Sequence, residues 1–283
     1  MRPTLPVLGL LLGGLLAGCS PSAETTVLPE GVTLHLDQSR MERQGREVFL
    51  RVTNHGDEPM HITGFVLESD RFEPVVWEGE ETVSAGYERD LEFELPPSRC
   101  GAEPNANDHL RADVELTYRF GDQGRTSRGT AVDRYGAVTR AMDGDCARHT
   151  LKEAADLTVG APQVVHPDAR PVLEVPVTLA PTGRRDDVRF GGFEPTVLFT
   201  TIEDPHDDLG VRLGPDDPVL QTALRVVPAR CDAHALADDK VGTLFGVRVL
   251  ADDLPDGAAF SLPLPDETRT ALKTYLQSAC GLD

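Results

Sequence analysis

Residues 91–100 have the sequence LEFELPPSRC, and this stretch decides the fold. Leu91, Phe93 and Leu95 alternate with two glutamates, so every second side chain is apolar. A period of two is typical of a β-strand with one face in a core. Cys100 follows shortly afterwards, so the stretch predicts a strand that leads into a cysteine.

The end of this stretch recurs in the second half of the chain. Pro97-Ser98-Arg99-Cys100 matches Pro228-Ala229-Arg230-Cys231, which lies 131 residues later and also follows an apolar strand-like run. The alternating run Val114, Leu116, Tyr118 then corresponds to Phe245, Val247, Val249. The chain therefore contains two copies of one unit. Between these landmarks three further positions match without a gap: Ala102, Ala106 and Asp108 against Ala233, Ala237 and Asp239.

The repeat chooses among the three disulfide connectivities that four cysteines allow. The second cysteine of each copy, Cys146 or Cys280, follows the first by 46 or 49 residues. Two equivalent units with one pair each predict the disulfides Cys100–Cys146 and Cys231–Cys280. Neither pair has the spacing of a zinc site.

Further strands and turns place the chain in the all-β class. Val48–Val52 and Val114–Tyr118 alternate like residues 91–95, and turn signals such as Gly121–Gly124 lie between such runs. We therefore expect two tandem immunoglobulin-like β-sandwich domains, each with one disulfide. The likeness to antibody domains is architectural only, because Trp77 precedes both cysteines of its copy instead of lying between them.

A short C-terminal helix is expected after these strands. Leu272, Tyr275, Leu276 and Ala279 have helical spacing. Pro265 and Asp266 stand at the start and Gly281 follows the end, which are typical helix boundaries. Cys280 would then tie the last turn of this helix to the sheet.

The N-terminus has the layout of a signal peptide. Arg2 is followed by an apolar run from Leu5 to Leu16, and this run of about a dozen residues is too short to cross a bilayer. Leu16-Ala17-Gly18-Cys19 resembles the lipobox of bacterial lipoproteins. The resemblance implies cleavage after Gly18, diacylglycerol on the Cys19 sulfur, and a lipid-anchored protein on the outer face of the cytoplasmic membrane.

These observations predict the domain organisation of the chain. The expected segments are a signal peptide (1–18), a flexible tether (19–30), a first β-sandwich domain (31–150), a linker (151–168) and a second β-sandwich domain (169–283).

The charge balance excludes some classes of partner. The chain has 47 Asp and Glu against 27 Lys and Arg, a net charge of −20, and no basic patch stands out in the sequence. Phosphate backbones and anionic lipid surfaces repel such a protein. We expect no nucleic-acid partner, and we assign the membrane contact to the lipid on Cys19.

The densest polar segment is Arg230–Lys240, RCDAHALADDK. It resembles a segment of uncharacterised exported proteins of high-GC Gram-positive bacteria, a resemblance that implies no activity. Asp232, His234 and Lys240 are the candidate binding loop, because these positions differ from their counterparts in the first copy: Gly101, Glu103 and His109. The segment has no nearby nucleophile and the chain has no GxSxG elbow, so no catalytic residue is predicted.

Two other patterns suggest cation-binding sites. Asp204–Asp208 with Asp216 and Asp217 offers carboxylates of the type that calcium prefers, but without the spacing of an EF-hand loop. Met60-His61 is the one soft-ligand pair that suggests copper. Neither pattern is complete, and we expect neither a metal nor a cofactor.

Taken together, the sequence favours a non-enzymatic, lipid-anchored binding or scaffolding protein outside the cytoplasm, with an envelope protein as a candidate partner. The alternative is a cation-dependent or enzymatic envelope protein that uses the Asp232/His234/Lys240 loop or the acidic stretch Asp204 to Asp217.

Overall fold

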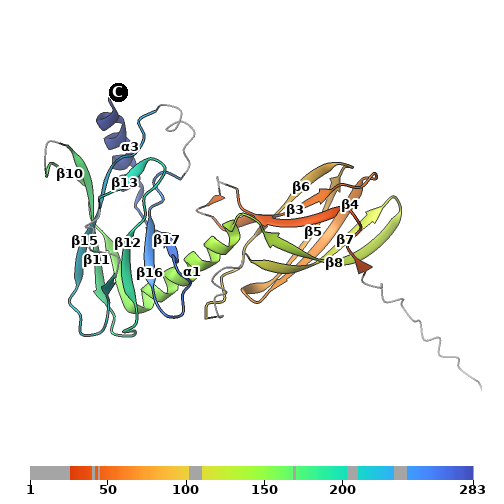
Figure 1. Ribbon diagram of the computed structural model, residues 1–283, viewed down its shortest axis with the longest axis horizontal. Coiled ribbons are helices and arrows are strands. Elements are labelled where there is room, and N and C mark those ends of the chain that lie inside the picture. The colour runs from red at the N-terminus through yellow and green to blue at the C-terminus, as the bar shows by residue number, and fades with distance from the viewer. Residues whose placement is uncertain are drawn as a thin grey trace, which may run out of the picture.

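A computed structural model describes residues 26–39, 42–43, 45–101, 110–167, 170–202, 210–232 and 241–282. Cys19 and the signal peptide lie outside the described residues. The chain is mostly β, with two hydrophobic cores, two disulfides and a C-terminal helix (Figure 1).

The first core lies within one large sheet, which we call the first β-unit. Its strands run in the order β5-β4-β7-β8-β2-β3-β6, with β1 beside β8. All neighbours are antiparallel except the pairs β2–β8 and β1–β8. The rings of Phe65 on β4 and Phe93 on β6 meet edge to face at 5.8 Å, so the sheet curls until its two ends share a core. The bounds are β1 (Thr26–Val27), β2 (Val32–Asp37), β3 (Glu47–Asn54), β4 (Met60–Ser69), β5 (Phe72–Val83), β6 (Tyr87–Glu94), β7 (Arg111–Phe120) and β8 (Gln123–Asp133).

The second core lies between two sheets, which with the C-terminal helix we call the second β-unit. One sheet has the order β10-β11-β15-β13 with β9 beside β11, and the other has the order β14-β12-β16-β17. Phe199 and Phe245 meet between them at 5.8 Å. The bounds are β9 (Ala155–Val159), β10 (Gln163–Val165), β11 (Val172–Pro181), β12 (Arg189–Phe193), β13 (Phe199–Thr201), β14 (Val211–Arg212), β15 (Leu220–Pro228), β16 (Gly246–Leu250) and β17 (Ala259–Ser261).

The disulfides join Cys100 to Cys146 and Cys231 to Cys280, the pairing that the repeat predicts. Each first cysteine follows a strand, β6 or β15. Each second cysteine lies on a helix, α1 (Ala137–Ala154) or α3 (Asp266–Cys280). Among the described residues, both copies of the repeat therefore have the order strand, cysteine, strand, strand, helix with cysteine.

The predicted C-terminal helix is confirmed as α3. It begins after Pro265 and ends at Gly281, which adopts the left-handed conformation with φ 63° that favours glycine. Tyr275 donates a hydrogen bond to the carbonyl of Pro171 at 2.8 Å, which fixes the helix against the start of β11.

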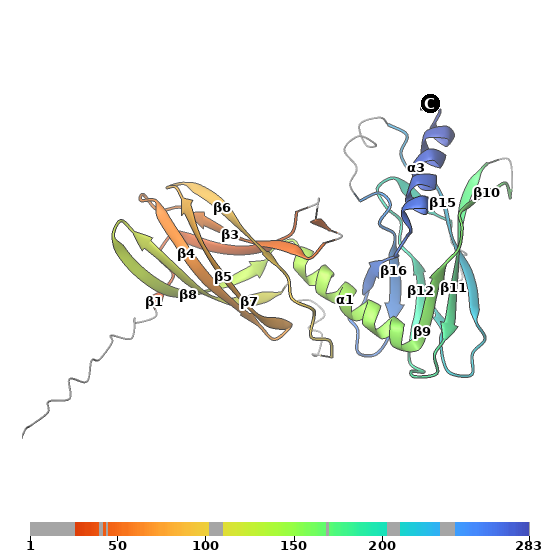
Figure 2. The same cartoon turned by 180° about the vertical axis from the view of Figure 1, so that it is seen from behind.

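The described residues contain a further helix that the sequence analysis did not predict, α1. Val138 and Met142 belong to the first core, whereas Ala147, Leu151 and Ala154 belong to the second. At 3.6 residues per turn these two sets point in directions about 180° apart. Because the apolar residues occupy opposite sides of the helix, the sequence shows no single apolar stripe. Figures 1 and 2 show α1 running from the first group of strands to the second.

Two predicted connecting segments are also corrected. The expected linker, residues 151–168, contains the end of α1 and strands β9 and β10, both of which pair with β11. The expected tether, residues 19–30, contains β1, which pairs with β8. Both segments lack a long apolar run of their own, so their pairing depends on strands that lie elsewhere in the chain.

Polar contacts hold α1 to both β-units. Asp143 pairs with Arg71 at 2.7 Å on the side of the first unit. At the other end, Arg184 donates to the carbonyl of Lys152 at 2.8 Å, and Arg185 lies 3.6 Å from Glu153. Arg185 also binds Asp187 at 2.6 Å, and this hydrogen bond lowers the pKa of the Asp187 carboxyl.

Gly144 marks a close approach between α1 and β17. A Cβ at this position would lie 3.0 Å from the carbonyl oxygen of Ala259. Glycine inside a helix costs about 1 kcal/mol relative to alanine, so the close approach is the physical reason for glycine here.

Replacing Gly144 by leucine should therefore lower the free energy of unfolding by about 1–3 kcal/mol, the usual range for overpacking. Chemical denaturation measures the change. His149→Leu places the same side chain on the exposed face of α1 and should change stability by less than about 0.5 kcal/mol. Equal stability of the two variants would contradict the close approach.

Candidate functional site

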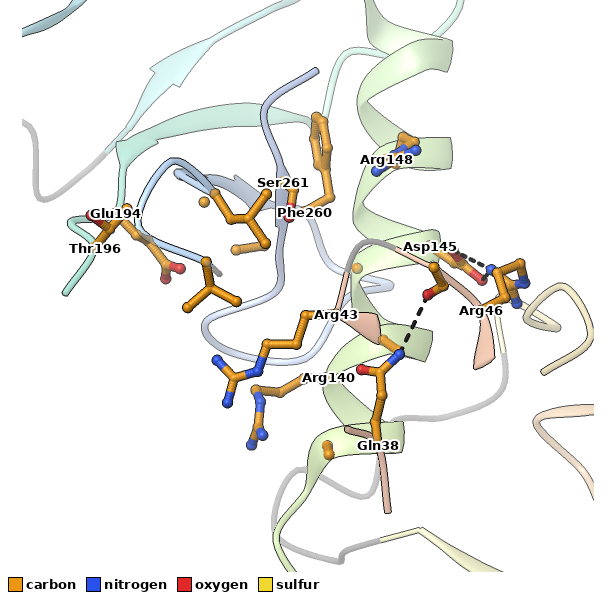
Figure 3. Close-up of a pocket in the computed structure, with 18 of the residues that line it drawn as sticks. Gln38, Arg43, Arg46, Arg140, Asp145, Arg148, Glu194, Thr196, Phe260 and Ser261 are labelled. Carbon is orange, nitrogen blue, oxygen red and sulfur yellow. Dashed lines mark hydrogen bonds and ion pairs between the residues drawn. The ribbon is translucent and has the colours of Figure 1, made fainter. Parts of the chain in front are cut away.

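A cleft of about 600 Å³ opens along α1, between the two β-units (Figure 3). Its residues come from the connection between β2 and β3, from one face of α1, and from three segments of the second β-unit: 194–197, 241–246 and 259–261. On α1 the cleft residues Ala137, Ala141, Gly144 and Arg148 fall between the two core-facing sides of the helix. The cleft therefore exists because one helix contributes to two cores and its third side is only partly covered, by the approach of β17 at Gly144.

Arg46 and Asp145 form the fixed part of the cleft wall. Arg46 Nη1 lies 2.8 Å from Asp145 Oδ2, and Arg46 Nε donates to the carbonyl of Leu95 at 2.6 Å. Arg46 also donates to the carbonyl of Pro96. Asp145 accepts a further hydrogen bond from Ser98 Oγ at 2.9 Å. This carboxylate is thus engaged in joining α1 to the first β-unit.

Three more arginines line the cleft without an ion pair in the described ranges. Arg140 donates to the carbonyl of Tyr135 at 2.8 Å, and the Arg148 guanidinium lies 5.4 Å from the centre of the Phe260 ring. Arg43 comes from the connection between β2 and β3. Gln38 Nε2 holds that connection by donating to the carbonyl of Glu42 at 3.0 Å. In Figure 3 the side chains of Arg43 and Arg140 point in the same direction.

The second β-unit supplies the opposite wall. Thr196 Oγ1 donates to the carbonyl of Gly242 at 2.7 Å. The backbone N–H of Glu194 donates to the carbonyl of Gly246 at 2.8 Å, and a Cβ on Gly246 would lie 2.3 Å from a Glu194 carboxylate oxygen. Gly246 therefore makes room for the Glu194 side chain. Val197 is an apolar residue of this wall that is 54% exposed.

The candidate binding loop predicted from the sequence is only partly described. Asp232 lies 3.3 Å from Arg230, whereas His234 and Lys240 lie outside the described residues. Val241, the next described residue after Lys240, lines the cleft. A described neighbour of the loop in sequence thus belongs to the cleft wall, although the sequence alone did not point to a cleft.

The acidic stretch is also partly described, because residues 204–208 lie outside the described ranges. Asp216 is exposed. Asp217 accepts a hydrogen bond from the backbone N–H of Gly214 at 2.7 Å and pairs with Arg212 at 3.0 Å. These contacts lower the pKa of the Asp217 carboxyl. Asp217 thus stabilises a local turn.

The structure separates the side chains of Met60 and His61. Met60 is fully buried in the first core, and His61 Nδ1 lies 2.8 Å from Thr82 Oγ1 on the outer face of the sheet. Successive residues of a strand point to opposite faces, so this pair does not converge on one ion. Among the described residues no group of three or more His, Cys, Asp or Glu is placed to hold a metal ion. The described helices include none that is long and apolar enough to span a bilayer.

Sequence reasoning missed the arginines of the cleft. Arg43 and Arg46 are about a hundred residues from Arg140 and Arg148, and each pair lies in a stretch that also contains acidic residues. The one local signal was the spacing of eight residues between Arg140 and Arg148, which places the two side chains within about 80° of each other around a helix once the helix is recognised.

No protein-family model and no curated protein sequence matches the chain. Several solved structures are similar at low identity, of which three follow. A transglutaminase of red sea bream is 11% identical over 84% of this chain, with a TM-score of 0.25. The B domain of a biofilm associated protein is 8% identical over 81% of this chain and 84% of that chain, with a TM-score of 0.23. An exo-chitosanase of Amycolatopsis orientalis is 14% identical over 82% of this chain and 26% of that chain, with a TM-score of 0.20. The chain spans 32% of the transglutaminase, and TM-scores of this size assign no function.

Proposed function

We propose that the chain is a lipid-anchored binding protein of the bacterial cell envelope that holds its ligand in the cleft along α1. The observation that carries the proposal is the cleft itself, with a volume of about 600 Å³ and a lining drawn from both β-units. Ligand sites of proteins are commonly clefts of about 300–1,000 Å³, and they occur preferentially between domains.

The contacts of α1 support a preformed cleft. The Cys100–Cys146 disulfide and the Arg46–Asp145 ion pair hold the helix to the first β-unit. Leu151 and Ala154 hold its other end in the second core. The two walls are therefore tied to one rigid element, which reduces the entropy that a ligand must overcome on binding.

The lipobox resemblance supports the location. In the described part of the chain, the first paired strand is β1, which begins at Thr26. From Cys19 to that strand the chain spans at most about 25 Å. In this proposal the first β-unit lies near the outer face of the cytoplasmic membrane, and the cleft stays accessible to small molecules and to a partner in the envelope.

Filling the cleft tests the proposal. The mature protein in nonionic detergent is heated with low-molecular-weight envelope extracts from the cells that make it. A ligand that binds only the native state should raise the unfolding midpoint of the wild type. At a hundredfold excess of ligand over Kd, the free energy of unfolding increases by about 3 kcal/mol. Val197→Trp should abolish the rise, because the indole occupies the cleft.

The matched control is Val76→Trp, the same change at a residue that is 67% exposed on β5 and outside the cleft. It should respond to the extracts like the wild type. A midpoint rise that survives in Val197→Trp, or no rise with any extract, would refute a ligand in the cleft.

A further inference from the structure

We infer that the ligand of the cleft carries an oxyanion, a carboxylate or a phosphate, and that Arg43 and Arg140 bind this group. The inference rests on the proposed function and adds the chemical class of the ligand. Three observations carry it: the charge of the cleft against that of the chain, the partners of its arginines, and the elements that present them.

The cleft reverses the charge balance of the protein. The whole chain has a net charge of −20. The described lining of the cleft has four arginines, Arg43, Arg46, Arg140 and Arg148, against two carboxylates, Asp145 and Glu194. A concave site with an excess of one sign of charge concentrates ligands of the opposite sign. An acidic protein thus has a cleft that attracts anions.

Of the four arginines in the cleft, Arg46 forms an ion pair within the chain, and the other three are available to bind a ligand. Arg46 is the partner of Asp145, at 2.8 Å, and of two backbone carbonyls. Arg43, Arg140 and Arg148 form no ion pair in the described part of the chain, although Arg148 lies over Phe260. The guanidinium group presents N–H donors in a planar fork that matches a carboxylate or phosphate. The available charge is therefore suited to an oxyanion.

Arg43 and Arg140 come from different elements and point the same way in the cleft (Figure 3). Gln38 holds the segment of Arg43 through the carbonyls of Glu42 and Gly45, at 3.0 and 3.3 Å. Arg140 is positioned by α1 and by the carbonyl of Tyr135. Two cations that line one cavity repel each other, and a bound anion reduces this cost. In this proposal, Arg43 and Arg140 together bind the oxyanion.

The N-terminus of α1 does not itself supply the site. Asp133 accepts hydrogen bonds from the backbone N–H groups of Ala137 and Thr139, at 2.9 and 2.6 Å. Those donors are therefore used within the chain, and the arginine side chains are the groups left to bind the ligand. Arg148 lies about 12 Å further along the helix, beside the ring of Phe260. In this proposal, these two side chains contact the part of the ligand that lies beyond the oxyanion.

Isothermal titration calorimetry of the mature protein in nonionic detergent, at low ionic strength, tests the inference with three matched sugars. Glucuronate carries a carboxylate, glucose 6-phosphate carries a phosphate, and glucose has the same frame without charge. We expect glucuronate or glucose 6-phosphate to bind and glucose not to bind. Binding of only one of the two anions identifies which oxyanion the site prefers.

The double variant Arg43→Gln with Arg140→Gln should weaken binding of the anion on the order of tenfold or more, as expected for lost charge-assisted hydrogen bonds. The control is Arg125→Gln with Arg189→Gln, which removes the same charge from two exposed arginines outside the cleft. It should bind like the wild type. Equal weakening in both double variants would show general attraction and overturn the site, as would the absence of binding at millimolar anion.

The two levels of the proposal fail in different ways. If glucose binds as tightly as both anions and Val197→Trp abolishes its binding, the oxyanion inference is overturned and the cleft remains a ligand site. If an anion binds and Val197→Trp leaves its affinity unchanged, the ligand does not lie in the cleft and both proposals are overturned.

Discussion

Cys19→Ala is expected to move the protein from the membrane fraction to the soluble fraction and to abolish its labelling by an alkyne analogue of palmitate. Each buried methylene of an acyl chain contributes about 0.8 kcal/mol, and stable anchoring requires two membrane signals such as the two chains of diacylglycerol. The polypeptide offers no electrostatic substitute, because its net charge is −20. Ultracentrifugation of lysed cells and in-gel detection of the label measure the two effects.

Ser20→Ala is the matched control, since it makes a similarly small change at the next residue and leaves the Cys19 thiol intact. This variant should keep both the label and the membrane association. Palmitate label on Cys19→Ala, or equal sedimentation of the two variants, would contradict the assignment as a lipoprotein.

Removing the Cys231–Cys280 disulfide, with both cysteines replaced by alanine, should lower the free energy of unfolding by about 4 kcal/mol. The bridge spans 49 residues and ties the last turn of α3 to the chain that follows β15. Without it the unfolded chain gains the entropy of an open loop of that length. Differential scanning calorimetry without reductant should record a midpoint lower by about 10 °C or more.

Alanine variants of Cys100 and Cys146 provide the comparison. That bridge spans 46 residues, so the chain-entropy effect should be similar. However, Cys146 belongs to α1, which contacts both cores, so this loss should affect the packing along the cleft as well. A Cys231/Cys280 variant whose midpoint stays within about 2 °C of the wild type would show that α3 is held by its apolar contacts alone.

Much of the fold was predictable because its signals are local. Leu91 and Phe93 alternate within β6, Leu95 follows directly after it, and all three are buried in the first core. Leu272, Tyr275 and Leu276 have helical spacing because they lie on one side of α3, and this side packs on one core. The cysteine pairing followed from the repeat, because two copies of one unit close the same kind of loop.

The candidate site was not predictable in the same way. The sequence pointed to Asp232, His234 and Lys240, because they form a dense polar segment and differ between the copies. Val241, directly after that segment in sequence, lines the cleft, but the arginines of the cleft come from residues 43–46 and from α1. These arginines do not form a basic patch in the sequence, because each has acidic residues near it.

The sequence by itself determined the strands with clear alternation, such as β3, β6 and β7, the last helix, the disulfide pairing and the overall acidity. Each of these depends on residue spacing or on a count. Only the tertiary structure decided that α1 joins two cores and that β9 and β10 pair with β11. It also gathered Arg43 and Arg140 in one cleft. The physical reason for the first is that a helix with apolar residues on two opposite sides has no single apolar stripe in its sequence. The reason for the arginines is that charges distant in sequence become neighbours only when packing brings their elements together.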